Sequence, residues 1–147
     1  MYPEKLHIVL AEDDQDDRLL FHRVFNHVKI KHTLEMCEDG IALMDYLETS
    51  QEKPHIIFLD LTMPGRSGME CLKQIRQNKA LNDVTVAIYS SSSVPATVEK
   101  AFILGANIYI KKPNEFDDLK KILTEIIYIN WQYITEGFNK EHFMINY

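Results

Sequence analysis

Apolar and polar residues alternate along the chain with two different periods. Short apolar or alternating runs predict five strands, and the unbroken run at 55–59 is typical of a central parallel strand covered on both faces. The predicted strands lie at 6–11, 32–37, 55–59, 84–89 and 108–110. Between them, apolar residues at three- and four-residue steps predict amphipathic helices. The predicted helices lie at 16–28, 38–50, 69–81, 95–105 and 115–134. Pro95 starts the fourth of them and Gly105 is its expected C-cap.

Five strand and helix pairs in succession predict an α/β fold. Such alternation implies a parallel sheet with helices on both faces and right-handed crossover connections. At 147 residues the chain is long enough to bury the core of one domain and leaves no room for a second. No internal repeat is visible beyond the four serines at 90–93.

Composition and charge narrow the class of protein. Apolar residues make up 46% and charged residues 26% of the chain, as in soluble globular proteins. The N-terminal apolar segment is too short for a signal peptide, and no run is long enough to cross a bilayer, so we expect a cytoplasmic protein without a membrane partner. Cys37 and Cys71 are far apart and are expected to be reduced and buried. The six histidines show no metal-ligand spacing.

The negative charge is concentrated near the N-terminus. The net charge is −6, from 16 basic and 22 acidic residues, and without the five acids at 12–17 it would be −1. This local acidity suggests a cation site and gives no support for nucleic acid as a partner.

Polar residues follow four of the five predicted strands. They are Glu12, Asp13 and Asp14 after the first strand, Asp60 after the third, Ser90 and Ser91 after the fourth, and Lys111 and Lys112 after the fifth. Each group alone has a simpler interpretation. Asp14 could cap the first helix, Asp16 and Asp17 could be ordinary first-turn acids, and the other residues could belong to solvated turns.

Taken together, these residues are chemically complementary. Ligand crevices of open parallel sheets lie outside the carboxyl ends of the strands, so the side chains should meet at one edge. Three carboxylates at close quarters do not all stay ionised without a cation, and Mg²⁺ prefers oxygen ligands of this kind. A lysine and a hydroxyl facing a metal-bound carboxylate would neutralise the charge of a phosphoryl group.

Residues 6 to 128 resemble the receiver domain of two-component response regulators, of the stand-alone kind similar to chemotaxis-type and phytochrome-linked receivers. The resemblance is carried by the acid pair Glu12–Asp13, the sequence LDLTMPG around Asp60, Ser90, and the dipeptide Lys112–Pro113. It implies a three-layer, doubly wound (βα)5 flavodoxin-like fold with strand order 2-1-3-4-5. We therefore expect a receiver domain at 1–128 and a helical, aromatic extension at 129–147 with no separate output domain.

The resemblance also assigns roles to individual residues. Asp60 would be the nucleophile that takes a phosphoryl group from a phosphohistidine. Mg²⁺ would be held by Asp13, Asp60 and the main-chain carbonyl of Thr62, with Glu12 acting directly or through water. Lys112 and Ser90 would each bind a phosphoryl oxygen. Tyr109 would turn inward when Ser90 moves, which would alter the surface of the fourth helix, fifth strand and fifth helix. An alternative interpretation of Tyr109 is a half-buried aromatic residue of the strand.

Two backbone features accompany these roles. The resemblance implies a cis bond between Lys112 and Pro113, which would direct Lys112 into the site. Gly65 would form a tight turn that lets the Thr62 carbonyl face the metal.

The same resemblance predicts the partners. They would be a sensor histidine kinase or a histidine phosphotransfer protein and a downstream protein target, and the chain would be a phosphoacceptor that is not a classified enzyme. The extension contains Trp131, Tyr133, Phe138, Phe143 and Tyr147. It could dimerise, dock a partner, or fold against its own domain.

Three other functions are compared with this prediction. A haloacid-dehalogenase-type phosphatase needs a second acid at the position of Thr62. A flavodoxin-like electron carrier needs a phosphate loop after the first strand, where this chain has acids. A receiver-shaped module that acts only by binding remains as the alternative, although such modules usually lack one of the acids or the lysine.

Overall fold

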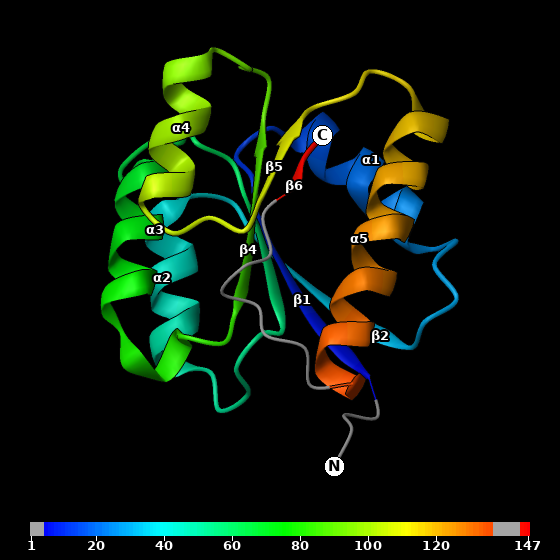
Figure 1. Cartoon of the computed structure of the whole chain (residues 1–147), viewed down its shortest axis with the longest axis horizontal. Helices are drawn as coiled ribbons and strands as arrows, with labels where there is room; N and C mark the ends of the chain where they lie inside the picture. Colours follow the sequence, from blue (N-terminus) through cyan, green and yellow to red (C-terminus); the bar gives the residue numbers. More distant parts are fainter. Residues whose placement is uncertain (1–4, 137–144) are drawn as a thin grey trace.

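The sheet consists of six parallel strands in the order β2-β1-β3-β4-β5-β6 (Figure 1). The computed structural model describes residues 5–136 and 145–147 of the chain. The strands are β1 (Leu6–Ala11), β2 (His32–Cys37), β3 (Ile56–Leu59), β4 (Thr85–Ser90), β5 (Ile108–Lys111) and β6 (Ile145–Asn146). The order of the first five strands confirms the prediction of a flavodoxin-like α/β fold.

Helices cover both faces of the sheet (Figure 1). They are α1 (Gln15–Phe25), α2 (Gly40–Thr49), α3 (Gly68–Gln77), the 3₁₀ turn η1 (Lys79–Leu81), α4 (Pro95–Ile103) and α5 (Phe116–Glu136). α1 and α5 lie on one face, and α2, α3 and α4 lie on the other (Figure 1). Among the described residues, no helix is both long and apolar enough to span a bilayer.

Each face of the sheet carries its own hydrophobic core, because successive strand residues point to opposite sides. The core beneath α2, α3 and α4 contains Val9, Ala11, Ile57, Leu59, Ile88 and Tyr109. The core beneath α1 and α5 contains Ile8, Leu10, Ile56, Phe58, Tyr89 and Ile110 together with Phe21. β1, β3 and β4 are buried along their whole length, which agrees with the apolar runs that predicted them. Cys37 and Cys71 are free and buried, as predicted.

Helices α1 and α3 end three and four residues earlier than their apolar spacing predicts. α1 ends at Phe25, and Asn26 closes it by donating its main-chain N–H to the carbonyl of His22. Val28 still packs against the core beneath α1 and α5, so its apolar character reflects packing outside the helix. The stretch predicted as one helix at 69–81 breaks at Asn78, whose side chain accepts a hydrogen bond from the N–H of Ala80 and starts the 3₁₀ turn.

The C-terminal residues add a strand that was not predicted. α5 continues to Glu136, and β6 then pairs with β5 in parallel, with Ile145 opposite Ile108. Tyr147 packs against the core beneath α1 and α5, which agrees with an extension that folds against its own domain at this residue. The side chains of Trp131, Tyr133, Phe138 and Phe143 lie outside the described residues.

Arg76 connects α3 to the region around β4 and β5. Its Nε donates to the carbonyl of Gly105 at 2.8 Å, its Nη1 to the carbonyl of Val84 at 2.9 Å, and its Nη2 to Asn107 Oδ1 at 2.7 Å. Gly105 has a φ of +109°, and a Cβ there would lie 2.7 Å from Arg76 Cγ. Burial lowers the pKa of the guanidinium, which nevertheless stays charged and satisfies these main-chain carbonyls.

Replacing Arg76 by Met should lower the free energy of unfolding by about 2–4 kcal/mol, because two partly buried carbonyls lose a charged donor. Urea denaturation followed by circular dichroism measures this change. Lys73→Met, on the exposed side of the same helix, is the matched control and should change stability by no more than about 0.5 kcal/mol. Equal effects of the two substitutions would contradict a connecting role for Arg76.

Candidate functional site

The predicted site residues come together at the C-terminal edge of the sheet. Parallel pairing places Ala11 opposite Leu59, so the residues that follow β1 and β3 leave the sheet at the same level. In the same way, Ser90 at the end of β4 lies opposite Lys111 at the end of β5. The order of the strands therefore gathers acids, hydroxyl and lysine along one edge, as the sequence predicts.

Three carboxylates form the centre of this edge. Glu12, Asp13 and Asp60 each offer an oxygen, and these oxygens lie within 4.8 Å of one another. Glu12 and Asp60 are buried, whereas Asp13 is exposed. A set of carboxylate oxygens that is buried on one side and open to water on the other fits a hard divalent cation such as Mg²⁺, which keeps several water ligands. The structure thus brings together the three acids that were predicted to hold a metal.

Lys112 supplies the positive charge of the cluster. Its Nζ forms an ion pair with Glu12, lies 2.9 Å from Asp17 Oδ2, and lies 3.7 Å from Asp60 Oδ2. Burial lowers the pKa of Lys112, but hydrogen bonds to Glu12 and Asp17 outweigh it, so the net shift of this pKa is upward. Lys112 is therefore charged throughout the physiological range.

The prediction of a cis bond between Lys112 and Pro113 is wrong. No cis peptide bond occurs in the described part of the chain, so this bond is trans. Lys112 reaches the acids nevertheless, because the main-chain N–H of Lys112 donates to the carbonyl of Ser90 at 2.7 Å and extends the pairing of β4 and β5 by one residue. The long lysine side chain covers the remaining distance.

Burial sets the protonation of the acids. Removal from water raises the pKa of Glu12 to about 8, and the adjacent Asp60 carboxyl adds to this shift, whereas Lys112 opposes it. Removal from water likewise raises the pKa of Asp60, against the attraction of Lys112. The ion pair between Lys112 and Glu12 therefore forms fully only when Glu12 has lost its proton. A divalent cation at the same place would favour the ionised form of both acids.

The loop after β3 brings Asp60 and Thr62 close together. The N–H of Thr62 lies 3.4 Å from Asp60 Oδ1. Gly65 has a φ of +80°, so the tight turn predicted there is confirmed. Gly68 was not predicted to matter, yet a Cβ on it would lie 2.0 Å from the main-chain oxygen of Asp60. The start of α3 can therefore pack directly beneath Asp60 only because residue 68 is glycine.

Ser90 and Tyr109 are both hydrogen-bonded to Ser92, in the loop that follows β4. Ser90 is buried, and its Oγ accepts a hydrogen bond from the N–H of Ser92 at 3.1 Å. The ring of Tyr109 is fully buried, and its hydroxyl donates to the carbonyl of Ser92 at 2.6 Å. Tyr109 thus points inward in this structure and is tied to the loop that follows Ser90.

Three contacts at the site were not predicted. Asp14 caps α1 as expected by accepting the N–H of Asp17, but the Asp17 side chain itself bonds to Lys112. Arg18 Nη1 donates to the carbonyl of Glu12 at 2.8 Å. The ring of Tyr89 lies beneath the Lys112 ammonium, 5.3 Å from its centroid. Asp17 lies in the first turn of α1, which begins just after the acid pair, and this nearness in sequence is the signal that could have identified it.

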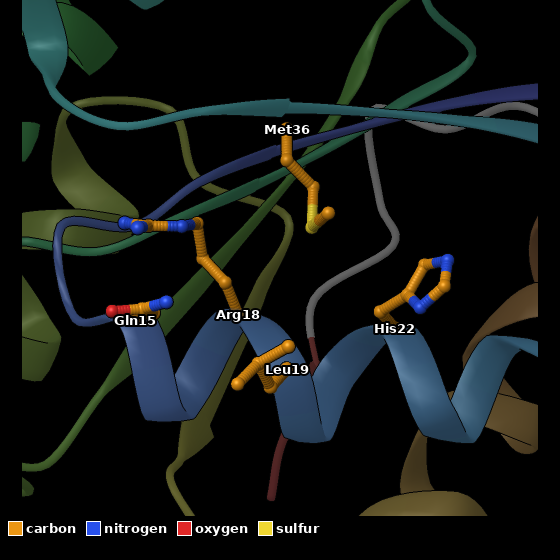
Figure 2. A pocket seen from close by; sticks show the side chains of 5 residues that line it. All are labelled: Gln15, Arg18, Leu19, His22 and Met36. Carbon is orange, nitrogen blue, oxygen red and sulfur yellow. The ribbon is translucent and has the colours of Figure 1, made fainter.

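A shallow apolar pocket lies near the site, between α1 and β2. It is lined by Gln15, Arg18, Leu19 and His22 of α1 and by Met36 of β2, whose side chains surround it in Figure 2. Leu19 is 54% exposed and Met36 is 37% exposed, so the pocket is accessible. Because α1 begins just after the acid pair, this surface borders the approach to the three carboxylates.

The raised pKa values give a pH-dependent stability. In EDTA, the folded state binds more protons than the unfolded state above the normal pKa of glutamate, 4.5, so the free energy of unfolding should fall as the pH rises from there to about 8. Urea titrations across this range measure the slope. Saturating Mg²⁺ should reduce it, because a cation offsets the repulsion of the acids.

Glu12→Gln should also reduce this slope, since glutamine does not titrate. Glu48→Gln, at an exposed position of α2, is the matched control and should leave the slope unchanged. Identical slopes for the Glu12→Gln variant and the wild-type chain would contradict the assigned shift.

Comparison with known proteins identifies the family. The model of the response regulator receiver domain matches residues 8–124. The chain is 29% identical to the "Two-component response regulator ARR17" of Arabidopsis thaliana, with 84% of this chain and 86% of that protein covered. It is 32% identical to the "Response regulator Rcp1" of Synechocystis sp., with coverage of 81% and 84%.

A solved structure supports the same assignment. The Mn(2+)-bound form of response regulator Rcp1 superposes with a TM-score of 0.75 at 31% identity, covering 82% of this chain and 91% of that one. The region that matches the family model runs from within β1 to within α5 and contains every element between them. The chain therefore belongs to the response regulator receiver domain family.

Proposed function

We propose that this protein is a single-domain response regulator that accepts a phosphoryl group on Asp60 in a Mg²⁺-dependent reaction. The observation that carries the proposal is the convergence of Asp60 with Glu12, Asp13 and Lys112 at one edge of the sheet. A buried carboxylate with two further acids and an ammonium around it is suited to receiving and neutralising a phosphoryl group.

Asp60 is the nucleophile of the proposed reaction. A carboxylate oxygen of Asp60 forms a bond to phosphorus as the bond from phosphorus to the histidine nitrogen of the donor breaks, and the imidazole leaves with the electron pair. The product is an acyl phosphate. Lys112 Nζ, 3.7 Å from Asp60 Oδ2, is close enough to bind one of the phosphoryl oxygens after a small movement.

The acids would hold the cation. Asp13 and Asp60 would bind it directly together with the carbonyl of Thr62, and Glu12 would do so directly or through water. A bound Mg²⁺ would supply positive charge to the phosphoryl oxygens and lower the repulsion between the incoming group and the acids. The manganese bound by the related Rcp1 supports a divalent cation at this edge.

Ser90 and Tyr109 are the proposed switch. Ser90 would turn its hydroxyl from the N–H of Ser92 toward a phosphoryl oxygen. Because Tyr109 bonds to the carbonyl of Ser92, a movement of this loop would reach Tyr109 and the surface of α4, β5 and α5. The altered surface would be the signal that a downstream protein reads.

The donor would be a sensor histidine kinase or a histidine phosphotransfer protein of the cytoplasm. Such a donor must bring a phosphohistidine to Asp60 and would pass over α1 and β2, where Leu19 and Met36 offer an apolar contact. The chain itself would act as a phosphoacceptor that catalyses its own phosphorylation and slow dephosphorylation, outside the classified enzymes. A homodimer is a further possible output.

Incubation with radiolabelled acetyl phosphate and Mg²⁺ should add one labile phosphoryl group to the wild-type chain. Asp60→Asn or addition of EDTA should abolish the label, because the first removes the nucleophile and the second removes the cation. Asp45→Asn, at an exposed position of α2, is the matched control and should be labelled like the wild type. Phosphate retention is measured after separation of the protein under mildly acidic conditions.

Label that persists in Asp60→Asn would overturn the assignment of the phosphoacceptor. A wild-type chain that takes no label from acetyl phosphate or from any histidine kinase would favour the alternative, a receiver-like module that acts only by binding.

A further inference from the structure

Lys112 is closer to Asp17 than to Asp60. Its Nζ lies 2.9 Å from Asp17 Oδ2 and 3.7 Å from Asp60 Oδ2, and it also pairs with Glu12. An ammonium has three N–H donors, and two of its nearest acceptors are thus carboxylates other than that of the proposed phosphoacceptor. The proposed function assigns Glu12 to the cation and leaves Asp17 without a role.

Asp17 is held in place by its surroundings. It lies in the first turn of α1, where its N–H donates to the capping carboxylate of Asp14 at 3.0 Å. The next residue, Arg18, bonds through Nη1 to the main-chain carbonyl of Glu12, which fixes this turn against the end of β1. The side chain of Asp17 is 33% exposed, and that of Lys112 is 14% exposed, so the pair is partly removed from water. This arrangement distinguishes it from a loose pair on the surface.

The ring of Tyr89 lies against the ammonium of Lys112 and limits where it can move. The ammonium lies 5.3 Å from the centroid of the Tyr89 ring, a distance at which the ring attracts a cation. The ring is fully buried and packs edge-on against Phe21 of α1, with 5.8 Å between centroids. Lys112 is therefore positioned by Asp17, Glu12 and the Tyr89 ring, and it can exchange Asp17 for a phosphoryl oxygen on Asp60.

We propose that Asp17 is a positioning residue that holds Lys112 away from Asp60 and competes with the phosphoryl group for its ammonium. This inference rests on the proposed function. When a phosphoryl group occupies Asp60, Lys112 moves toward it and away from Asp17, and the weakened ion pair with Asp17 opposes the phosphorylated state. Asp17 thereby lowers the stability of the phosphorylated state and keeps Lys112 in place between signals.

The competition predicts that loss of Asp17 strengthens binding of a phosphoryl analogue. With Mg²⁺ present, beryllium fluoride should half-saturate Asp17→Asn at a concentration about 2- to 5-fold lower than the wild-type chain, the factor expected for a partly exposed ion pair. Saturation is followed by the rise in melting temperature. Asp16→Asn, an exposed acid of the same helical turn, is the matched control for charge alone and should bind like the wild type.

A double-mutant cycle ascribes the effect to Lys112. In the Lys112→Met background, Asp17→Asn should no longer change the half-saturating concentration, because the ammonium for which Asp17 competes is gone. A second cycle by urea denaturation in EDTA needs neither metal nor analogue. There, the shifts in midpoint caused by Asp17→Asn and Lys112→Met should be clearly less than additive.

The outcomes separate the inference from the function on which it rests. If the wild-type chain does not bind beryllium fluoride, the proposed function fails and the inference fails with it. If the wild-type chain binds but Asp17→Asn binds equally or more weakly, only the positioning role of Asp17 is overturned. Additive midpoint shifts in EDTA would overturn the ion pair itself.

Discussion

Glu12 and Asp60 are buried beside one another at the end of two adjacent strands, where each carboxylate loses water and faces a like charge. Burial disfavours the ionised form of both acids and raises both pKa values, and the neighbouring Asp60 raises the pKa of Glu12 further. The fold tolerates this arrangement because Lys112 lies between the acids and because the side toward Asp13 is open to water and cations. A positively charged ligand at this edge of the sheet therefore stabilises the folded chain, and removal of the ligand destabilises it. This dependence makes the edge responsive to ligands and unsuited to a purely structural role.

Much of this arrangement could be predicted from the sequence for a simple reason. Buried parallel strands leave unbroken apolar runs, and the residues that follow them meet at one edge whatever their distance in the chain. Glu12, Asp60, Ser90 and Lys112 were identified on this basis. The contacts that were not predicted depend on the length of individual side chains and on the close packing of main-chain segments. The length of the lysine side chain allows Lys112 to bind Asp17, and only the packing of α3 beneath Asp60 shows why residue 68 is glycine.

Apolar patterns in the sequence could not predict very short elements, the break in a helix or the isomer of a peptide bond. β6 has two residues, too few for a period to be seen, and it forms because β5 offers a free edge. The helix at 69–81 was predicted as continuous because its apolar spacing persists, whereas Asn78 ends it through its own side-chain hydrogen bond. The Lys112–Pro113 bond is trans although the family resemblance implied cis, and the hydrogen bond from Lys112 to Ser90 directs the chain toward the acids without it.

Two tyrosines on adjacent strands connect the site with the hydrophobic cores on both faces of the sheet. Tyr89 of β4 lies in the core beneath α1 and α5 and contacts Lys112, whereas Tyr109 of β5 lies in the core beneath α2, α3 and α4 and bonds to Ser92. Ser90 follows Tyr89 directly and precedes the loop that Tyr109 holds. A displacement of Ser90 would therefore shift side chains on both faces of the sheet, because both tyrosine rings are fully buried in closely packed cores.

β6 also changes what surrounds the end of the chain. Tyr147 donates its N–H to Tyr109 at 2.8 Å and accepts from the N–H of Lys111 at 3.3 Å, so it is bound on either side of Ile110 and one residue before Lys112. Residues added after Tyr147, such as an affinity tag, would begin next to Lys112. Tests of the proposed phosphoryl transfer are therefore best made with tags at the opposite terminus or removed by protease.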